Sequence, residues 1–252
     1  MLGILMLDTQ FPRLPGDVGN AGSFTSCAVR HRVVRGASPA AVVRGDDAAL
    51  LEPFVEAGLA LVAEGARALG TSCGFLARWQ RELQAALPVP VWSSSLLVLA
   101  DEARGQRCGV ITIEAASLTP RHFEAVGGDA ATPVEGITPG SALHRTLLED
   151  LPVLDAADAE AQVLAAGTRL LRRHPELQAL VLECTNLPPY APALRRATGL
   201  PVFDVVSMLQ GRMARMAGMK GMEGTERIAG AAGTAGMEGS ARPAATVERG
   251  NR

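Results

Sequence analysis

The chain has 252 residues, 48% of them hydrophobic, which is enough apolar material for one large core or two smaller ones of roughly 100 residues each. A formal net charge of −2 and a pI near 6.1 leave no basic excess to neutralise phosphates, so the composition argues against nucleic acid as a partner. No apolar run reaches the roughly 18 to 20 residues of a membrane span, no leader peptide is recognisable, and the four cysteines show no close pairing, so we expect a cytoplasmic protein without a membrane partner.

Strand-like apolar runs alternate along the chain with helical segments, which is typical of an α/β fold with mainly parallel sheets. Two segments, Asp46–Gly65 and Asp155–His174, have apolar residues at helical spacing, and each opens with an aspartate that can serve as an N-cap. The predicted strands are Gly3–Leu7, Ala66–Thr71, Pro88–Trp92, Cys108–Ile113, Ala179–Glu183 and Pro201–Val205.

An internal duplication relates the two halves of the chain. Laying Cys73 on Cys184 also matches their surroundings without a gap, including a Pro-Val strand start at Pro90 and Pro201. A second, slightly shorter shift relates Gly3 and Asp8 in "GILMLD" to Gly109 and Glu114 in "GVITIE". The order of strands, helices and cysteine turn therefore repeats, and the sequence predicts two similar α/β lobes.

Two cysteines follow predicted strands at matched positions. In parallel α/β sheets ligands bind outside the carboxyl ends of the strands, so Cys73 and Cys184 are expected to face each other across a cleft between the lobes. We expect a helix to begin directly after each cysteine, and the N-terminus of a helix lowers the pKa of a nearby thiol. Two thiols on opposite sides of one carbon can remove a proton and return it on the other face, which inverts a stereocentre without a cofactor.

Several other chemistries lack their residues. The only lysine is Lys220, in a glycine-rich tail, so neither a pyridoxal phosphate Schiff base nor a Walker-type phosphate loop has its lysine. The four histidines are scattered singly, with no His-x-x-x-His and no Cys-x-x-Cys, so we expect no metal and no other cofactor. The remaining cysteines, Cys27 and Cys108, fit the role of small buried hydrophobic residues.

The motifs "GTSCGFL" (Gly70–Leu76) and "LECTNLPPY" (Leu182–Tyr190) resemble the paired cysteine motifs of the aspartate/glutamate racemase superfamily, which includes hydantoin racemases, arylmalonate decarboxylases and maleate isomerases. The resemblance covers about residues 1–216 and implies two pseudosymmetric lobes with the substrate between them and one catalytic cysteine from each. Asp8 stands where glutamate racemases have a first-strand aspartate. Those racemases typically carry Asn-Thr after the first cysteine and His after the second Cys-Thr, whereas this chain has Gly74 and Phe75, and Asn186; the "GTS" loop leans towards the decarboxylase and isomerase branches.

Together these observations predict an α/β protein of two pseudosymmetric Rossmann-like lobes with parallel sheets and an active site in the cleft between them. We expect residues 1–94 to form the first lobe and 95–204 the second; the resemblance implies that a helix at 205–217 crosses back to the first lobe. Residues 218–252 have a composition typical of a disordered tail. The sequence leaves a homo-oligomer open.

The function predicted first is a cofactor-independent racemase or epimerase of an amino acid or a related small carboxylate similar to aspartate or glutamate. Alternatives are a hydantoin racemase, a decarboxylase or cis-trans isomerase of the same superfamily, and, outside the enzymes, a two-lobed binding protein. The candidate catalytic residues are Cys73, Cys184 and Asp8, and the candidate substrate-binding residues are Thr71, Ser72, Gly74, Thr185, Asn186 and Asn20.

Overall fold

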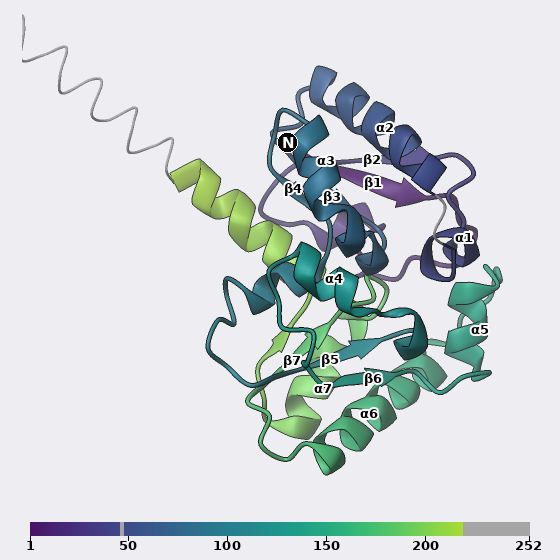
Figure 1. Ribbon diagram of the computed structural model, residues 1–252. Helices are drawn as coiled ribbons and strands as arrows, with labels where there is room; N and C mark the ends of the chain where they lie inside the picture. Colours follow the sequence, from purple (N-terminus) through teal and green to yellow (C-terminus); the bar gives the residue numbers. More distant parts are fainter. Residues whose placement is uncertain (46–47, 219–252) are drawn as a thin grey trace, which may run out of the picture. The chain divides into compact units, whose positions relative to one another are not determined.

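Two four-stranded parallel sheets organise the unit Met1–Ala214 (Figure 1). The computed structural model of this chain describes residues 1–45 and 48–218. The first sheet has the order β2-β1-β3-β4, formed by β1 (Leu2–Leu7), β2 (Val29–Val34), β3 (Ala68–Thr71) and β4 (Val91–Trp92). The second has the order β6-β5-β7-β8, formed by β5 (Cys108–Thr112), β6 (Val134–Gly136), β7 (Ala179–Leu182) and β8 (Val202–Phe203). The predicted fold class is confirmed.

Helices cover the sheets, with α2 packed on β1 and β2 and α6 packed on β5 and β6 (Figure 1). Asp155 caps α6 by accepting hydrogen bonds from Ala157 and Asp158, as predicted. The other predicted cap, Asp46, lies outside the described residues, and α2 begins at Leu51. The helices are α1 (Pro39–Val43), α2 (Leu51–Ala63), α3 (Gln80–Ala86), α4 (Pro120–Ala125), α5 (Ala142–Leu148), α6 (Ala156–Arg173) and α7 (Ala191–Thr198), and the 3₁₀ helices are η1 (Ala21–Ser23), η2 (Ala48–Leu50), η3 (Gly74–Trp79), η4 (Ser95–Leu99), η5 (Ala115–Ser117) and η6 (Pro188–Tyr190).

The strand register confirms the internal duplication. In the first sheet Leu2 pairs with Ala68, and in the second Cys108 pairs with Ala179. Cys108 follows Leu2 at the same sequence separation as Gly109 follows Gly3, and Ala179 follows Ala68 at the separation of the two matched cysteines. The central strands β1, β3, β5 and β7 are buried throughout, as expected for parallel strands covered on both faces. Each half therefore brings its cysteine to the same end of an equivalent sheet.

The pairing of the edge strands β4 and β8 shows the same duplication. Leu69 of β3 pairs with Val91 of β4, and Leu180 of β7 pairs with Val202 of β8. Both members of the second pair are displaced from those of the first by the separation of the matched cysteines. The duplication seen in the sequence is therefore a duplication of strand pairing as well.

The sequence pattern did not predict the strands β2 and β6. The strand β2 lies at a sheet edge, and its charged residues Arg30 and Arg32 both pair with Glu64 at the end of α2. The strand β6 is only three residues long and carries Glu135, which Arg169 of α6 binds at 2.7 Å. Charged residues that are neutralised by a neighbouring helix interrupt the apolar pattern on which strand prediction depends.

A helix over residues 205–218 follows β8. Its Leu209 lies against Gly70 of β3, where an added methyl group would come within 2.9 Å of the leucine side chain. Arg212 forms ion pairs with Asp101 and Glu102 at 2.8 and 2.9 Å. The predicted disordered tail, apart from its first residue, and Lys220 lie outside the described residues. Among the helices of the described part, none combines the length and apolar character needed to cross a bilayer.

Candidate active site

The loops that follow β3 and β7 meet at the carboxyl ends of the two sheets. Cys73 and Cys184 each stand two residues beyond the end of their strand. The loops are joined directly, because the hydroxyl of Thr185 donates a hydrogen bond of 2.6 Å to the carbonyl oxygen of Ser72. The hydroxyl of Ser95, at the start of η4, donates at 2.7 Å to the carbonyl of Leu182 at the end of β7 and holds the base of the second loop. The two cysteine loops therefore form one unit.

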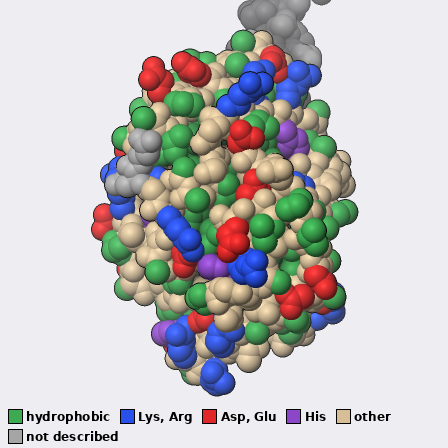
Figure 2. Space-filling view, turned by 90° about the vertical axis from the view of Figure 1, so that its right-hand side faces the viewer, with side chains coloured by type: hydrophobic (Ala, Val, Ile, Leu, Met, Phe, Trp, Pro, Cys, Tyr) green, Lys and Arg blue, Asp and Glu red, His purple; other side chains and the backbone are tan. Residues whose placement is uncertain are grey.

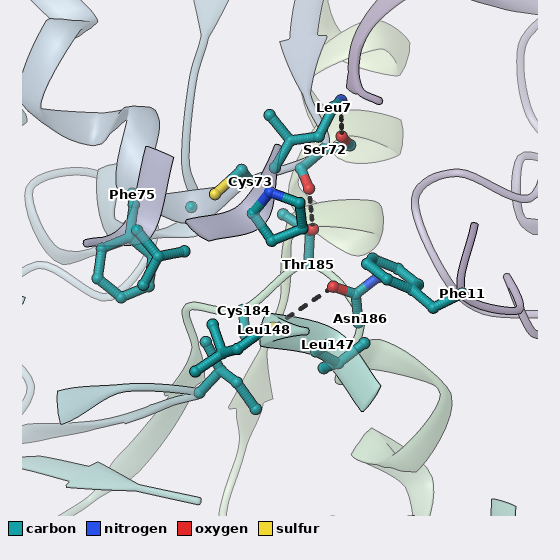
Figure 3. A pocket seen from close by; sticks show the side chains of 14 residues that line it. Leu7, Phe11, Ser72, Cys73, Phe75, Leu147, Leu148, Cys184, Thr185 and Asn186 are labelled. Carbon is teal, nitrogen blue, oxygen red and sulfur yellow. Dashed lines mark hydrogen bonds between the residues drawn. The ribbon is translucent and has the colours of Figure 1, made fainter. Parts of the chain in front are cut away.

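Cys73 and Cys184 both line a small cavity between the lobes, and Figure 3 labels both residues. The cavity is narrow, with a volume of about 30 Å³, and it is partly open to solvent. Its walls are mostly apolar, with Phe11 and Phe75 as the aromatic side chains and no charged side chain among the lining residues that the structure describes. The lining residues are Leu7, Phe11, Pro39, Val43, Ser72, Cys73, Gly74, Phe75, Ile113, Leu147, Leu148, Cys184, Thr185 and Asn186.

Burial dominates the ionisation of both thiols. Cys73 and Cys184 are 7% and 6% exposed. Burial, and after it the charge of Glu183, raises the pKa of Cys73 to about 12 and that of Cys184 well above the ordinary value of 9.0. The backbone of Phe75 and that of Asn186, each two residues after its cysteine, form hydrogen bonds that lower the pKa values, but by less than burial raises them.

The structure corrects the expectation that a helix N-terminus lowers the thiol pKa values. After Cys73 the chain forms the 3₁₀ helix η3, and α3 begins only at Gln80. After Cys184 a turn precedes η6, and α7 begins only at Ala191. Short 3₁₀ segments lack the aligned dipole of a long α-helix, and burial removes most of the solvent that would stabilise a thiolate.

The predicted substrate-binding residues divide into two groups. Ser72, Gly74, Thr185 and Asn186 line the cavity together with the thiols. Thr71 is fully buried beneath it and shapes the first cysteine loop, because its hydroxyl contacts the carbonyls of Ser93 and Cys73 at 2.6 and 3.0 Å. In the second loop, the side-chain amide of Asn186 accepts from the Cys184 thiol at 3.6 Å, and its nitrogen donates to Asp17 at 2.6 Å.

The other two predicted site residues lie outside the cavity lining. Asp8 is exposed, and its carboxylate accepts a long hydrogen bond of 3.4 Å from the backbone of Gly36. Asn20 caps η1 and donates to the carbonyl oxygen of Arg13 at 3.0 Å. The structure thus brings Cys73 and Cys184 together but leaves Asp8 and Asn20 in loop contacts of their own.

Sequence reasoning missed Glu183, which precedes Cys184 and is fully buried. Burial raises the pKa of its carboxyl group from 4.5 to about 7, and the Thr112 hydroxyl, which donates at 2.6 Å, acts in the opposite direction. The signal was present in the sequence, because a glutamate that ends the apolar run "ALVLE" beside a cysteine has to be buried with its strand.

The rim of the cavity is held by contacts between the lobes. The carboxylate of Asp150, in the turn after α5, accepts hydrogen bonds from the backbone of Gln10 and Phe11 at 2.7 and 3.2 Å. Glu114 pairs with Arg44 at 2.7 Å and lies 3.4 Å from the ring of His144. Figure 2 shows the face over α1 and α5, on which acidic, basic and histidine side chains gather near the middle.

Solved structures share this arrangement of two lobes. Allantoin racemase from Klebsiella pneumoniae superposes with a TM-score of 0.57 at 18% identity, over 87% of this chain and 89% of the other. A variant of arylmalonate decarboxylase in a sulfate-associated form superposes with a TM-score of 0.55 at 17% identity, over 80% of this chain and 86% of the other. This protein has the fold of the aspartate/glutamate racemase superfamily. The predicted resemblance to this superfamily is confirmed at the level of the fold.

Proteins named for a different activity are similar to this chain in sequence. Dimethylsulfoniopropionate lyase of a Durusdinium species (clade D) is 27% identical over 237 residues, which cover 81% of this chain and 71% of that protein. Dimethylsulfoniopropionate lyase 5 of Emiliania huxleyi is 29% identical over 224 residues, and the matched part covers 82% of this chain but only 44% of that relative. No model of a protein family matches the chain.

Proposed function

We propose that this protein is an enzyme that removes a proton from the carbon next to the carboxylate of a small acid, with Cys73 and Cys184 as the proton-transferring groups. The observation that carries the proposal is that equivalent loops of the two lobes bring both thiols to one cavity. Two acid–base groups at one carbon are sufficient for such chemistry without a cofactor. No step of the proposed reaction uses Asp8, because it lies outside the cavity lining.

The reaction that we infer first is a lyase reaction on a carboxylate with a positively charged sulfonium group two carbons away. Loss of the proton next to the carboxylate forms a carbon–carbon double bond while the carbon–sulfur bond breaks and its electron pair leaves with the sulfur. The similarity to dimethylsulfoniopropionate lyases supports this choice of substrate. An apolar cavity with the rings of Phe11 and Phe75 also suits a sulfonium group, because its methyl groups are apolar and its charge is attracted to aromatic faces.

The polar side of the cavity suits the carboxylate. Ser72 accepts a hydrogen bond from the backbone of Leu7 at 2.8 Å, and its hydroxyl hydrogen can in turn be donated to the substrate carboxylate.

In this proposal Cys73 is the base, because Arg78 and Arg13 act to lower its pKa, whereas Asp17 acts to raise that of Cys184. Since a cavity volume of about 30 Å³ is far smaller than a substrate molecule, we infer that the lobes move apart to admit one.

Racemisation is the second candidate, and the pseudosymmetric placement of the thiols favours it. The first step is the same, but the proton returns from the other thiol on the opposite face of the carbon. The fold likeness to a glutamate racemase from Thermus thermophilus, with a TM-score of 0.54 at 22% identity, is compatible with both reactions, because the superfamily fold also carries a decarboxylase.

Two assays on the purified protein separate the candidates. Dimethylsulfoniopropionate is supplied and released dimethyl sulfide is measured by gas chromatography; in parallel, D- and L-aspartate, glutamate and allantoin are incubated in D₂O and exchange of the proton at the stereocentre is followed by NMR. We expect the wild type to release dimethyl sulfide. The rate of release should fall at least ~100-fold in Cys73→Ser and stay unchanged in Cys27→Ser, which lies away from the cavity. Exchange without sulfide release would favour the racemase, and a protein inactive in both assays would contradict the proposed function.

A further inference from the structure

The carboxyl group of Glu183 lies buried between the two cysteine loops. The residue is fully buried, and its backbone N–H donates to Ile111 at 2.9 Å, which extends the pairing of β7 with β5 by one residue. One carboxyl oxygen, Oε2, accepts from the hydroxyl of Thr112 at 2.6 Å. The other, Oε1, is buried and has no hydrogen-bond partner among the described residues. Burying a carboxyl oxygen without a hydrogen-bond donor costs free energy, which points to a role for this oxygen beyond holding the fold together.

The oxygen without a partner lies against the backbone of the first loop. A methyl group added at Gly74 would come within 2.3 Å of Oε1 and within 2.3 Å of the carbonyl oxygen of Glu183. Gly74 directly follows Cys73, and Glu183 directly precedes Cys184. The carboxyl group thus lies behind the cavity wall, next in the chain to one thiol and packed on the residue beside the other.

The carboxyl group of Glu183 is electrostatically coupled to the thiols of Cys73 and Cys184. Its charge is the second largest cause, after burial, of the raised pKa values of both Cys73 and Cys184. Burial keeps the pKa of the carboxyl itself near 7, so it changes charge in the working range of an enzyme. The titratable, charged and hydroxyl groups on the segments packed around it are Cys73 and Arg78 at η3, Cys184 and Thr185 in its own loop, Cys108 and Thr112 on β5, and Ser95 on η4.

We propose that Glu183 is the positioning residue that stores the proton of the reacting thiol, so that a thiolate forms in the cavity only while Glu183 is protonated. The step is a balanced proton exchange: Cys–SH and Glu183 carboxylate become Cys–S⁻ and Glu183 carboxylic acid, with Oε1 as the oxygen free to take the proton. The site thereby holds one negative charge at a time and avoids two buried anions. This inference rests on the proposed function only for the statement that the thiolate is the base.

The test is thiol alkylation, which needs no substrate. Iodoacetamide is added to the folded wild type and to Glu183→Gln at a series of pH values from 6 to 10, and labelling of each cysteine is followed by peptide mass spectrometry. Removing the nearby negative charge should let the thiols ionise more readily, so we expect labelling of Cys73 and Cys184 to become about three- to tenfold faster above pH 7. Labelling of Cys27 and Cys108 serves as the internal control for the integrity of the fold.

Turnover should change in the opposite direction. Without a carboxylate to take the proton, Glu183→Gln is expected to lose about 10- to 100-fold in the rate of sulfide release or proton exchange. Faster labelling of the two cavity thiols combined with slower turnover is a result that a merely structural role does not produce. Unchanged or slower labelling of both thiols in a folded Glu183→Gln protein would overturn the inference, whatever the substrate proves to be.

A second variant keeps the inference testable if Glu183→Gln does not fold. Thr112→Val removes the hydroxyl that favours the ionised carboxylate, so Glu183 stays neutral to higher pH and labelling of the cavity thiols should again become faster, by about two- to threefold at pH 8. Thr146→Val is the matched control, because Thr146 is also buried and donates to a backbone carbonyl, that of Val153, at 2.9 Å. Equal labelling of the cavity thiols in both threonine variants would overturn the proposal. A protein that labels as expected but turns over no tested acid would contradict the proposed function alone.

Discussion

The two cysteine loops have the same place in their lobes but different chemistry. When Cys73 is laid on Cys184, Ser72 corresponds to Glu183, Gly74 to Thr185 and Phe75 to Asn186. In the first loop a serine hydroxyl accepts from the backbone of β1, whereas in the second a buried carboxylate accepts from Thr112 of β5. The duplication thus fixes where the thiols lie, and the residues beside them decide how readily each one ionises.

The largest difference expected from this comparison is between the two serine variants. Arg78 and Arg13 lower the pKa of Cys73, whereas Cys73 and Asp17 raise that of Cys184, so Cys73 is the thiol that ionises more readily. If elimination is the reaction, Cys73→Ser should lose about 10²- to 10⁴-fold in kcat and Cys184→Ser clearly less. Steady-state kinetics of both variants measure this difference. Equal losses would instead favour racemisation, in which both thiols move a proton.

The second prediction concerns the dependence of stability on pH. The pKa of Glu183 is raised from 4.5 to about 7 in the folded protein, so the folded state holds its proton more tightly than the unfolded state. This stabilises the fold below pH 4.5, and the contribution is lost as the pH rises to about 7, with a total of about 3 kcal/mol in the free energy of unfolding. Urea unfolding at pH 5 and pH 8 measures it.

In Glu183→Gln the difference in unfolding free energy between the two pH values should shrink by a corresponding amount, because glutamine does not titrate. Glu135→Gln, a buried carboxyl group paired with Arg169, is the matched control and should not reproduce this change. An identical pH dependence in the wild type and in Glu183→Gln would show that this carboxyl group does not titrate near pH 7.

The third prediction tests the close approach of the loops at Gly74. Gly74→Ala places a methyl group 2.3 Å from a backbone oxygen, which cannot move without shifting β7, so we expect a loss of about 1–3 kcal/mol in unfolding free energy. Gly128→Ala is the control, because the nearest atom there is a side-chain atom of Leu99 at 3.3 Å. Thermal unfolding compares the two. A Gly74→Ala protein as stable as the control would mean that the loops have room to separate.

The smallest effect is expected at the rim. Asp150 has a positive φ of 55° and links the turn after α5 to the loop of Phe11. Asp150→Gly keeps the backbone conformation and removes the carboxylate, so the cavity should open more often and both thiols should be alkylated about two- to fivefold faster. This gain should be the same at every pH, in contrast to that of Glu183→Gln. A gain confined to high pH would assign Asp150 an electrostatic role instead.

Much of this architecture could be predicted because it is local or repeated. The buried strands show as apolar runs, and the shared surroundings of Cys73 and Cys184 place both thiols at one end of equivalent sheets. The edge strand β2 was missed because its arginines are neutralised by Glu64, which is distant in sequence. The direction of the thiol pKa shifts was wrong, because burial depends on how the lobes close. The contact of Glu183 with Gly74 joins residues from opposite halves of the chain, and no local pattern encodes it.

The matched strand registers make each half of this chain equivalent to one subunit of a symmetric dimer. A half-length chain with this strand order, paired with an identical copy, would present two thiols across a true twofold axis, but its two loops would have to be identical. An acid beside one thiol would then be accompanied by a second acid beside the other, and two carboxyl groups would be buried next to the small cavity. When both halves belong to one polypeptide, the sequences of their two cysteine loops can differ. Serine at position 72 and glutamate at position 183 can then coexist, so one carboxyl group serves two thiols.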